Sequence, residues 1–254
     1  MMLHPDGAWA SHVTGARWCG VAVPDSSTTH VSVTAAKDRR WQPGLKPHVA
    51  PRGTKTRTWR GVRVSDPIRM FIELASMLDL VDLVVAGDNM LRVFGLTAEQ
   101  LVAGLEESRD YWSPAARHAA QFVRDDVDSP METRLRMLIV LAGLPEPEVN
   151  VKLRDRDGNV VVRFDLGYPH LRLAIEYDGR QHVEIIENWE SDIDRGDLVD
   201  AARWRIVKVI ARGIYVEPGR TLERVRRALE DRGVRLPEQS DEWRKHFPGR
   251  RTAA

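Results

Sequence analysis

The sequence is poor in cysteine and contains no long apolar run. Cys19 is its single cysteine, which excludes an intrachain disulfide framework and a cysteine-based zinc cluster. A membrane helix needs about 18 or more apolar residues in succession, and no such stretch is present. The N-terminus also lacks the basic segment and hydrophobic core of a secretory signal. We therefore expect a cytoplasmic protein that makes no membrane contact.

Excess charge of one sign is also absent. The 38 Lys and Arg and the 37 Asp and Glu leave a formal net charge of +1, so any attraction to nucleic acid must be local. Residues 37 to 63 form such a basic segment, with nine Lys or Arg, one acid and two tryptophans, Trp41 and Trp59. This composition suits DNA contact, for which Lys55, Arg57 and Arg60 are the candidates. It equally suits the solvated side of a small sheet whose tryptophans pack inward.

The chain is long enough for two domains with real cores. Residues 1–65 are predicted to form an α+β basic domain, and residues 66–127 a helical connector. Asp66 followed by Pro67 is typical of a helix start. Residues 128–235 are predicted to form an α/β domain with a mixed sheet flanked by helices, which makes the chain α+β overall. Residues 236–254 are polar, and we expect a flexible tail.

Residues 160 to 182, VVVRFDLGYPHLRLAIEYDGRQH, carry the most informative pattern. Two runs rich in Val, Ile, Leu and Phe flank residues 167 to 170, which predicts a β-hairpin. Side chains alternate along a strand, so Asp165 falls on the polar side of the first run, and Glu176 and Asp178 share the polar side of the second. Clustered carboxylates repel one another, and a bound divalent metal would neutralise them. The alternative is a surface hairpin whose charged residues face water.

The metal interpretation depends on the hairpin register. With a turn limited to residues 167 to 170, Asp165 would lie about 13 Å along the strand from Glu176, too far for one ion to bridge. A longer turn or a bulge would bring the two carboxylates together. Gly167 and Pro169 make an irregular turn reasonable.

Further elements surround the hairpin. Ser129, Pro130 and Glu132 predict a helix start, with Glu132 as the third residue of a capping box. A strand is expected at residues 149 to 153, and residues 206 to 210, IVKVI, predict a central strand. Arg212, just after that strand, is a further candidate for phosphate contact.

The order of helix, three strands, helix, strand and helix resembles the restriction-endonuclease-like, or PD-(D/E)xK, nuclease core. The closer resemblance, over roughly residues 128 to 232, is to the domain of unknown function 559 family, which is related to very-short-patch-repair endonucleases. The matching motifs are Ser129-Pro130-x-Glu132, Arg163-Phe164-Asp165, Ile175-Glu176-x-Asp178-Gly179-x-x-His182 and Arg203-Trp204-Arg205-Ile206-Val207. Residues 9 to 95 resemble the AbiEi antitoxin group through Ser11-His12-Val13-Thr14-x-Ala16-Arg17, Ser65-Asp66-Pro67-Ile68-Arg69 and Val85-Ala86-Gly87-Asp88. That group usually begins with a winged-helix segment, which this chain is expected to lack.

The nuclease resemblance implies metal-dependent hydrolysis of DNA without a small-molecule cofactor. Asp165 and Glu176 would hold Mg²⁺ or Mn²⁺, and Glu132 would hold the ion or its waters. Asp178 stands where the family motif has a lysine. The missing positive group would then come from another side chain near the motif. The candidates are Arg163, Arg180 and His182.

Glu132, Asp178 and His182 also have structural explanations, as a capping residue, a turn residue and a polar contact respectively. The competing function is a DNA-binding regulator or antitoxin whose nuclease fold is degenerate. A third alternative is a protein-interaction partner in a toxin–antitoxin pair.

Overall fold

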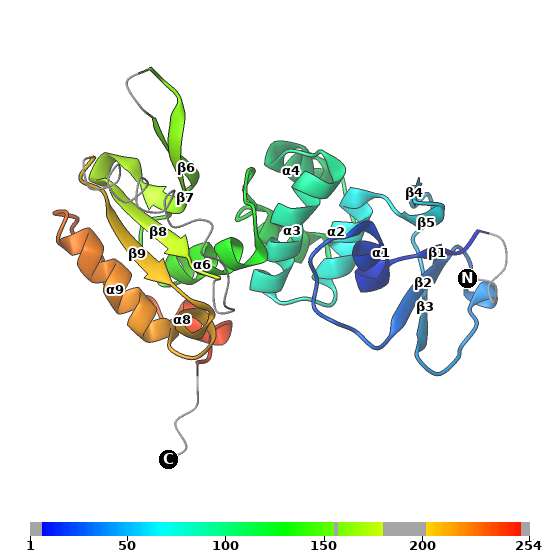
Figure 1. Ribbon diagram of the computed structural model, residues 1–254. Helices are drawn as coiled ribbons and strands as arrows, with labels where there is room; N and C mark the ends of the chain where they lie inside the picture. The colour runs from blue at the N-terminus through cyan, green and yellow to red at the C-terminus, as the bar shows by residue number, and fades with distance from the viewer. Residues whose placement is uncertain (1–6, 155–156, 180–201, 250–254) are drawn as a thin grey trace, which may run out of the picture. The chain divides into compact units, whose positions relative to one another are not determined.

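The computed structural model describes residues 7–154, 157–179 and 202–249. The chain divides into two compact units, unit 1 (Met1–Asp125) and unit 2 (Asp126–Ala254). Each unit contains one mixed β-sheet flanked by helices (Figure 1). The expected α+β class is therefore confirmed. In the part of the chain that the structure describes, no helix is both long and apolar enough to cross a membrane.

The sheet of unit 1 has the strand order β3-β2-β1-β5-β4. Its strands are β1 (Trp9–Ala10), β2 (Thr29–Val33), β3 (Leu45–Val49), β4 (Thr56–Trp59) and β5 (Val62–Ser65). β1 pairs antiparallel with β2 and parallel with β5, β2 pairs parallel with β3, and β4 pairs antiparallel with β5. Strand β4, which carries part of the basic segment, is thus an edge strand.

The first helix that the structure describes in unit 1 lies between β1 and β2 in the chain, and the other four follow the last strand of the sheet. The helices are α1 (His12–Cys19), α2 (Pro67–Ala75), α3 (Leu80–Phe94), α4 (Ala98–Glu106) and α5 (Ser113–Ala120). Helix α1 contacts β2, β5 and α2, and α2 contacts α3, α4 and α5. As predicted, the Asp66 side chain caps α2 by accepting a hydrogen bond from the Ile68 N–H. The sheet and the helices after residue 66 therefore belong to one compact unit.

The sheet of unit 2 has the strand order β6-β7-β8-β9. Its strands are β6 (Glu148–Arg154), β7 (Val160–Tyr168), β8 (Leu173–Tyr177) and β9 (Arg205–Val209), and its helices are α6 (Pro130–Leu141), α8 (Ala211–Tyr215) and α9 (Pro218–Glu230). β7 is antiparallel to both β6 and β8, and β8 is parallel to β9. The order of helix, three strands, a later strand and a final helix agrees with the prediction over the described residues. Among the described strands β9 lies at the edge of the sheet, not at its centre as predicted.

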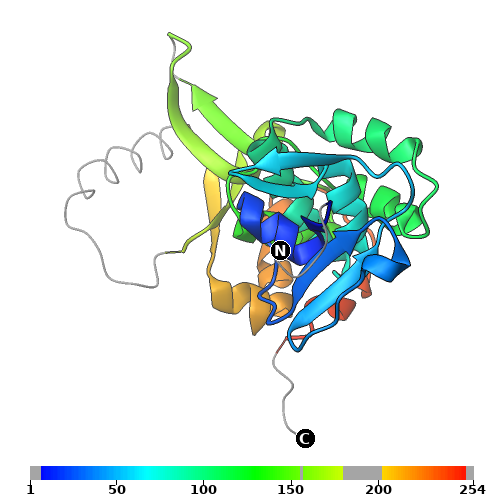
Figure 2. The ribbon, with the colours of Figure 1, turned by 90° about the vertical axis from the view of Figure 1, so that its right-hand side faces the viewer.

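Strands β6 and β7 are longer than their neighbours. β7 pairs with β6 over most of its length but with β8 only from Leu166 to Tyr168. The remainder of the β6–β7 ribbon extends beyond β8 and β9 (Figure 1, Figure 2). The β7 residues just before Leu166 therefore lie where the ribbon leaves the rest of the sheet.

The hairpin turn is not at residues 167 to 170, where the sequence predicted it. β7 continues through Gly167 and Tyr168, and the turn is a 3-10 segment (Pro169–Leu171) followed by Arg172 with a left-handed φ of 50°. Tyr168 is held in the strand because its ring is buried and its hydroxyl donates to the Pro145 carbonyl at 2.6 Å. A Cβ on Gly167 would lie 2.9 Å from the Leu173 carbonyl oxygen, so the close strand approach requires glycine here.

The chain after α9 is packed on unit 2 as far as the described residues reach, to residue 249, in contrast to the flexible tail that we predicted for residues 236–254. Residues 250–254 lie outside the described residues. Trp243 and Phe247 are buried, and the Ser240 N–H donates to the Ala142 carbonyl after α6. Trp243 lies in a short 3-10 turn, η4 (Glu242–Lys245), and Phe247 follows this turn, where its N–H donates to the Trp243 carbonyl at 2.8 Å. Burial of these rings outweighs the polarity of the surrounding sequence.

Candidate functional site

The register of β7 and β8 brings two of the predicted carboxylates together. Leu166 pairs with Ile175 and Gly167 with Ala174, so the next position places Asp165 opposite Glu176. The regular ladder ends there, and the Tyr177 N–H donates instead to Asp165 Oδ2 at 2.8 Å. The turn has the predicted length of four residues, but it lies two positions later in the chain, and this shift brings Asp165 opposite Glu176.

The two carboxylates line one pocket of about 240 Å³ in unit 2. The residues around it are Arg163, Asp165, Glu176, Tyr177, Asp178, Gly179 and Lys208. Glu176 is buried and Asp165 half-buried, whereas Lys208 is exposed. Carboxylate oxygens are the donors that hard divalent cations such as Mg²⁺ and Mn²⁺ prefer, so this donor set fits the ion implied by the sequence.

Lys208 is a pocket residue that the sequence analysis missed. β8 and β9 are parallel, and their register places Lys208 beside Glu176. It is the one charged residue within the apolar run IVKVI. A lysine that interrupts a buried strand pattern is a detectable signal, but its neighbour across the sheet depends on a contact distant in sequence.

Glu132 has both a capping role and an electrostatic link to this pocket. Its N–H donates to Ser129 Oγ at 3.3 Å, and its carboxylate accepts from the Asp128 N–H at 3.1 Å. Burial raises the pKa of Glu132, and the nearby Asp165 carboxylate raises it further. The Ser129 cap is therefore confirmed, but the Glu132 carboxylate accepts from the Asp128 N–H and not from the Ser129 N–H that the predicted capping box requires. Glu132 also lies close enough to Asp165 for their charges to interact.

Of the other residues predicted for this pocket, Asp178 and Arg163 line it, whereas two more lie outside the described residues. Asp178 lines the pocket at the end of β8, where its N–H donates to the Val209 carbonyl at 2.7 Å. Arg163 also lines the pocket and forms a 2.7 Å ion pair with Asp128. Arg180 and His182 lie outside the described residues.

Lys208 also lines a second pocket, whose other charged residues are mostly basic. This basic pocket has a volume of about 480 Å³ and is lined by Lys208, Ile210, Arg212, Gly213, Glu217, Arg220, Thr221 and Arg224. Arg212, predicted to contact phosphate, forms a 2.7 Å ion pair with Glu217. Because Lys208 lines both pockets, the basic surface is continuous with the carboxylate pocket.

The three predicted DNA contacts of unit 1 lie along its sheet edge. Lys55, Arg57 and Arg60 are all exposed, and they lie just before, within and just after β4. The Arg57 guanidinium lies 5.2 Å from the Trp59 ring centre and 5.4 Å from that of Phe94. Trp59 is half-buried and Trp41 is exposed, so only one of the two tryptophans of the basic segment packs inward as the sheet alternative requires.

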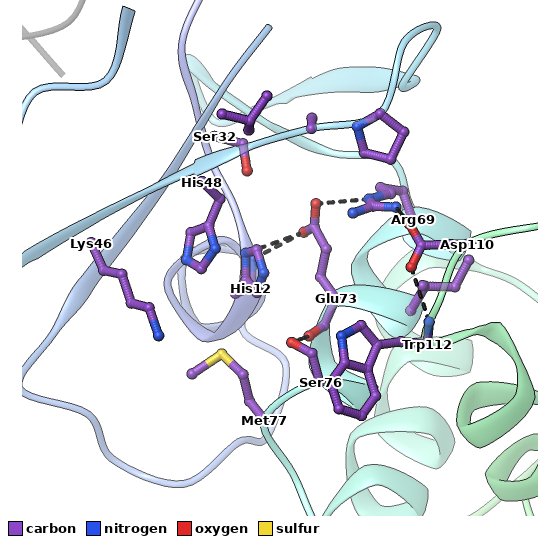
Figure 3. A pocket seen from close by; sticks show the side chains of 14 residues that line it. His12, Ser32, Lys46, His48, Arg69, Glu73, Ser76, Met77, Asp110 and Trp112 are labelled. Atoms are coloured by element: carbon purple, nitrogen blue, oxygen red, sulfur yellow. Dashed lines mark hydrogen bonds and ion pairs between the residues drawn. The ribbon is translucent and has the colours of Figure 1, made fainter. Parts of the chain in front are cut away.

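Unit 1 also contains a histidine cluster that the sequence analysis missed. His12, His30 and His48 each place one ring nitrogen within 4.8 Å of the other two. Burial, together with the neighbouring imidazoles and cationic side chains, lowers the pKa of His12 to about 2 and that of His48 to about 4. His12 and His48 line a pocket of about 270 Å³ together with Lys46, Glu73 and Asp110 (Figure 3). The three histidines come from separate elements, so no local motif marks them.

Two mycobacterial proteins are similar to the chain. They are the uncharacterized protein Rv2248 of Mycobacterium tuberculosis (strain ATCC 25618 / H37Rv) and the uncharacterized protein MT2308 of strain CDC 1551 / Oshkosh. Each is 26% identical over 173 residues, which span 68% of this chain and 60% of the relative. No protein-family model matches the sequence. No solved structure shows a significant match either.

Proposed function

We propose that unit 2 is a metal-dependent endonuclease domain that hydrolyses phosphodiester bonds in DNA. The observation that carries the proposal is the pocket in which Asp165, Glu176 and Lys208 meet. Two carboxylates can hold a hard divalent ion, and an adjacent ammonium can neutralise a phosphate. A surface hairpin with solvated charges would not need a buried Glu176 beside Asp165.

In this proposal Asp165 and Glu176 hold Mg²⁺ or Mn²⁺. Such an ion polarises the scissile phosphate and lowers the pKa of an attacking water. The Tyr177 N–H holds one oxygen of Asp165, which restricts the orientation of the carboxylate that would bind the ion. Glu132, with its raised pKa, holds waters near the ion by hydrogen bonding.

Lys208 takes the role of the lysine that the sequence motif lacks. Its position in β9 beside Glu176 supplies an ammonium from a neighbouring strand, whereas Asp178 occupies the usual position on β8. The ammonium stabilises the negative charge that develops on the phosphate in the transition state. An ionised carboxylate at position 178 cannot donate in this way.

The basic pocket beside the carboxylates provides a path for the DNA backbone. Arg212, Arg220 and Arg224 line it together with Lys208. Guanidinium groups bind phosphate oxygens in a bidentate manner, independent of base sequence. We therefore assign DNA backbone contact to this pocket of unit 2.

A second candidate function is a DNA-binding regulator or antitoxin with an inactive nuclease fold. Asp178 in place of the usual lysine favours this function, because it adds negative charge to a pocket that must bind phosphate. In that case unit 2 would bind DNA or a protein partner through the basic pocket without cleaving it.

Cleavage of supercoiled plasmid and of single- and double-stranded oligonucleotides tests the proposal. Wild type should cleave at least one substrate with Mg²⁺ or Mn²⁺ and none with a chelator. Asp165→Asn and Glu176→Gln should lose cleavage, while Glu223→Gln, an exposed α9 residue outside both pockets, should retain it. DNA binding without cleavage by wild type would favour the regulator. Equal cleavage by all preparations would indicate a contaminating nuclease.

A further inference from the structure

The histidine cluster of unit 1 is built from three elements of the fold. His12 begins α1, His30 lies in β2, and His48 lies in the adjacent parallel strand β3. In the β2–β3 register His30 pairs with Lys46 and Ser32 pairs with His48, so the two strand histidines are diagonal neighbours. The His12 ring stacks on that of His48 with 3.8 Å between ring centres. All three imidazoles therefore meet at one place on the sheet.

The backbone at His12 is held in an unusual conformation. Its φ is 53°, in the left-handed region that is strained for a residue with a Cβ. Its N–H donates to Glu73 Oε2 at 3.0 Å, and Glu73 is fully buried as a side chain. Glu73 also accepts hydrogen bonds from Ser65 at 2.8 Å and Arg69 at 3.0 Å. A buried polar network thus fixes the start of α1 and aims its histidine.

The Nδ1 side of the His12 ring is oriented by neighbouring side chains. Ser11 Oγ lies 3.0 Å from this nitrogen, and the Ser32 hydroxyl donates to Ser11 at 2.8 Å. Glu73 Oε2 lies 3.9 Å from the same nitrogen (Figure 3). Metal-binding imidazoles usually have one nitrogen engaged in this way, with a hydroxyl or carboxylate, while the other nitrogen holds the ion.

A hydrogen-bonded stack of structural histidines is the competing explanation. His30 Nδ1 lies 2.9 Å from His48 Nε2, which accounts for one nitrogen of each ring. Nitrogens bound to one tetrahedral ion at about 2.0–2.1 Å are separated by about 3.3 Å. The observed nitrogens span this value, from 2.9 Å to within 4.8 Å. The planes of the His12 and His48 rings are only 21° apart in this stack, so binding one ion through all three nitrogens requires the rings to rotate out of the stack.

The imidazole donor set and the adjacent space suit a cation with nitrogen ligands. The charge of Arg69 is offset by ion pairs to Glu73 and to Asp110, the latter at 2.7 Å. The adjacent pocket of about 270 Å³ leaves room for a fourth, non-protein ligand. Imidazole suits Zn²⁺, Ni²⁺, Cu²⁺ and Fe²⁺, whereas Mg²⁺ prefers oxygen. Three protein ligands and one open position are typical of catalytic rather than structural zinc sites.

We propose that His12, His30 and His48 form a binding site for one transition-metal ion, with Zn²⁺ as the reference case, whose fourth position opens into this pocket. Lys46, on the same β3 strand and lining the pocket, would favour an anionic fourth ligand such as a carboxylate or phosphate. This site lies in unit 1 and is independent of the carboxylate pocket proposed for unit 2.

Metal binding to the full-length, metal-stripped protein tests this site. The parent protein for these measurements carries Asp165→Asn and Glu176→Gln, and so do the histidine variants made from it. These two substitutions remove the carboxylate pocket as a second source of metal binding. The parent should bind one equivalent of Zn²⁺ by calorimetry and elemental analysis, and Co²⁺ should give the strong visible absorption of a four-coordinate site. His48→Gln, at the half-exposed histidine, should weaken Zn²⁺ binding at least tenfold. His118→Gln, an exposed histidine of α5, is the matched control.

Two results would overturn the proposal. One is a parent protein that binds no Zn²⁺ and gives only weak octahedral Co²⁺ absorption. The other is equal Zn²⁺ affinity for His48→Gln and His118→Gln, which would place any bound ion elsewhere. The Co²⁺ spectrum of the parent needs no histidine variant, so it remains decisive even if a substitution impairs folding.

Discussion

Lys208 lies beside Glu176, in register on the neighbouring parallel strand. This relationship sets an ammonium next to a buried carboxylate in the same pocket as Asp165. It gives the pocket a positive group although Asp178 occupies the position where the nuclease motif that the sequence resembles has lysine. The chemistry proposed for unit 2 therefore depends on β9 as much as on the β7–β8 hairpin.

Replacement of Lys208 tests its proposed role. Lys208→Gln should reduce the rate of DNA cleavage by about 100-fold or more, the usual effect of losing one donor to a developing negative charge. Lys208→Arg should restore part of the rate. Lys245→Gln removes an exposed lysine outside both pockets and should leave the rate unchanged. Equal rates for Lys208→Gln and Lys245→Gln would remove Lys208 from the mechanism.

Asp165 should be important for both metal binding and stability. Asp165→Ala leaves the Tyr177 N–H without its acceptor, which should cost about 1–3 kcal/mol in urea unfolding. Asp165→Asn retains an acceptor oxygen and should cost less. Millimolar Mg²⁺ should raise the Tm of wild type by mass action but not that of Asp165→Asn/Glu176→Gln. An Mg²⁺ response that survives in the double variant would place the ion outside this pocket.

The salt dependence of DNA binding should locate the interface. Each phosphate contact contributes about 0.9 to the slope of log affinity against log salt. The triple variant Arg212→Gln/Arg220→Gln/Arg224→Gln should therefore flatten the slope and weaken binding. Arg227→Gln/Arg235→Gln/Lys245→Gln removes the same charge from exposed positions outside both pockets and serves as the control.

The same salt-dependence assay tests whether the edge strand β4 of unit 1 contacts DNA. Lys55→Gln/Arg57→Gln/Arg60→Gln will flatten the slope if β4 contacts DNA, as the basic segment predicts. A slope equal to that of wild type would assign these residues to the solvated sheet edge. The two triple variants thus separate the contributions of the two units.

Trp243 should stabilise unit 2. Its ring is 3% exposed, so Trp243→Ala should lower the free energy of unfolding by about 3–5 kcal/mol. Trp41→Ala, at a ring that is 66% exposed, should change stability by no more than about 0.5 kcal/mol. Chemical denaturation followed by circular dichroism measures both. A small effect of Trp243→Ala would mean that the segment after residue 236 contributes little to the core.

The buried thiol of Cys19 should lower the free energy of unfolding at high pH. Burial raises its pKa from 9.0 to about 11, against the opposing effect of Arg57 and Arg60. The unfolded chain therefore loses this proton first, so stability is complete below pH 9 and falls as the pH rises toward 11. Urea unfolding of wild type and Cys19→Ala over this range should show a decline in wild type that the variant lacks. Parallel curves would show that the thiol ionises equally in both states.

Local sequence patterns determined much of the secondary structure. Asp66 and Ser129 cap their helices as predicted, and Thr97 with Gln100 forms a capping box. These features depend on residues three or four positions apart, so the sequence displays them directly. The alternation in residues 160 to 177 likewise indicated two paired strands with carboxylates on one side.

Tertiary structure decided which of these groups meet. The register that opposes Asp165 and Glu176 depends on Gly167 and Tyr168 remaining in β7, and Tyr168 remains there because of its contact with Pro145. Lys208 reaches the pocket through pairing between strands distant in sequence, and the three histidines of unit 1 meet through the β2–β3 register and the start of α1. Propensity and capping are local, whereas side-chain convergence depends on long-range strand pairing and burial. The sequence alone therefore determined the elements and the chemical types, and only the fold decided which side chains share a pocket.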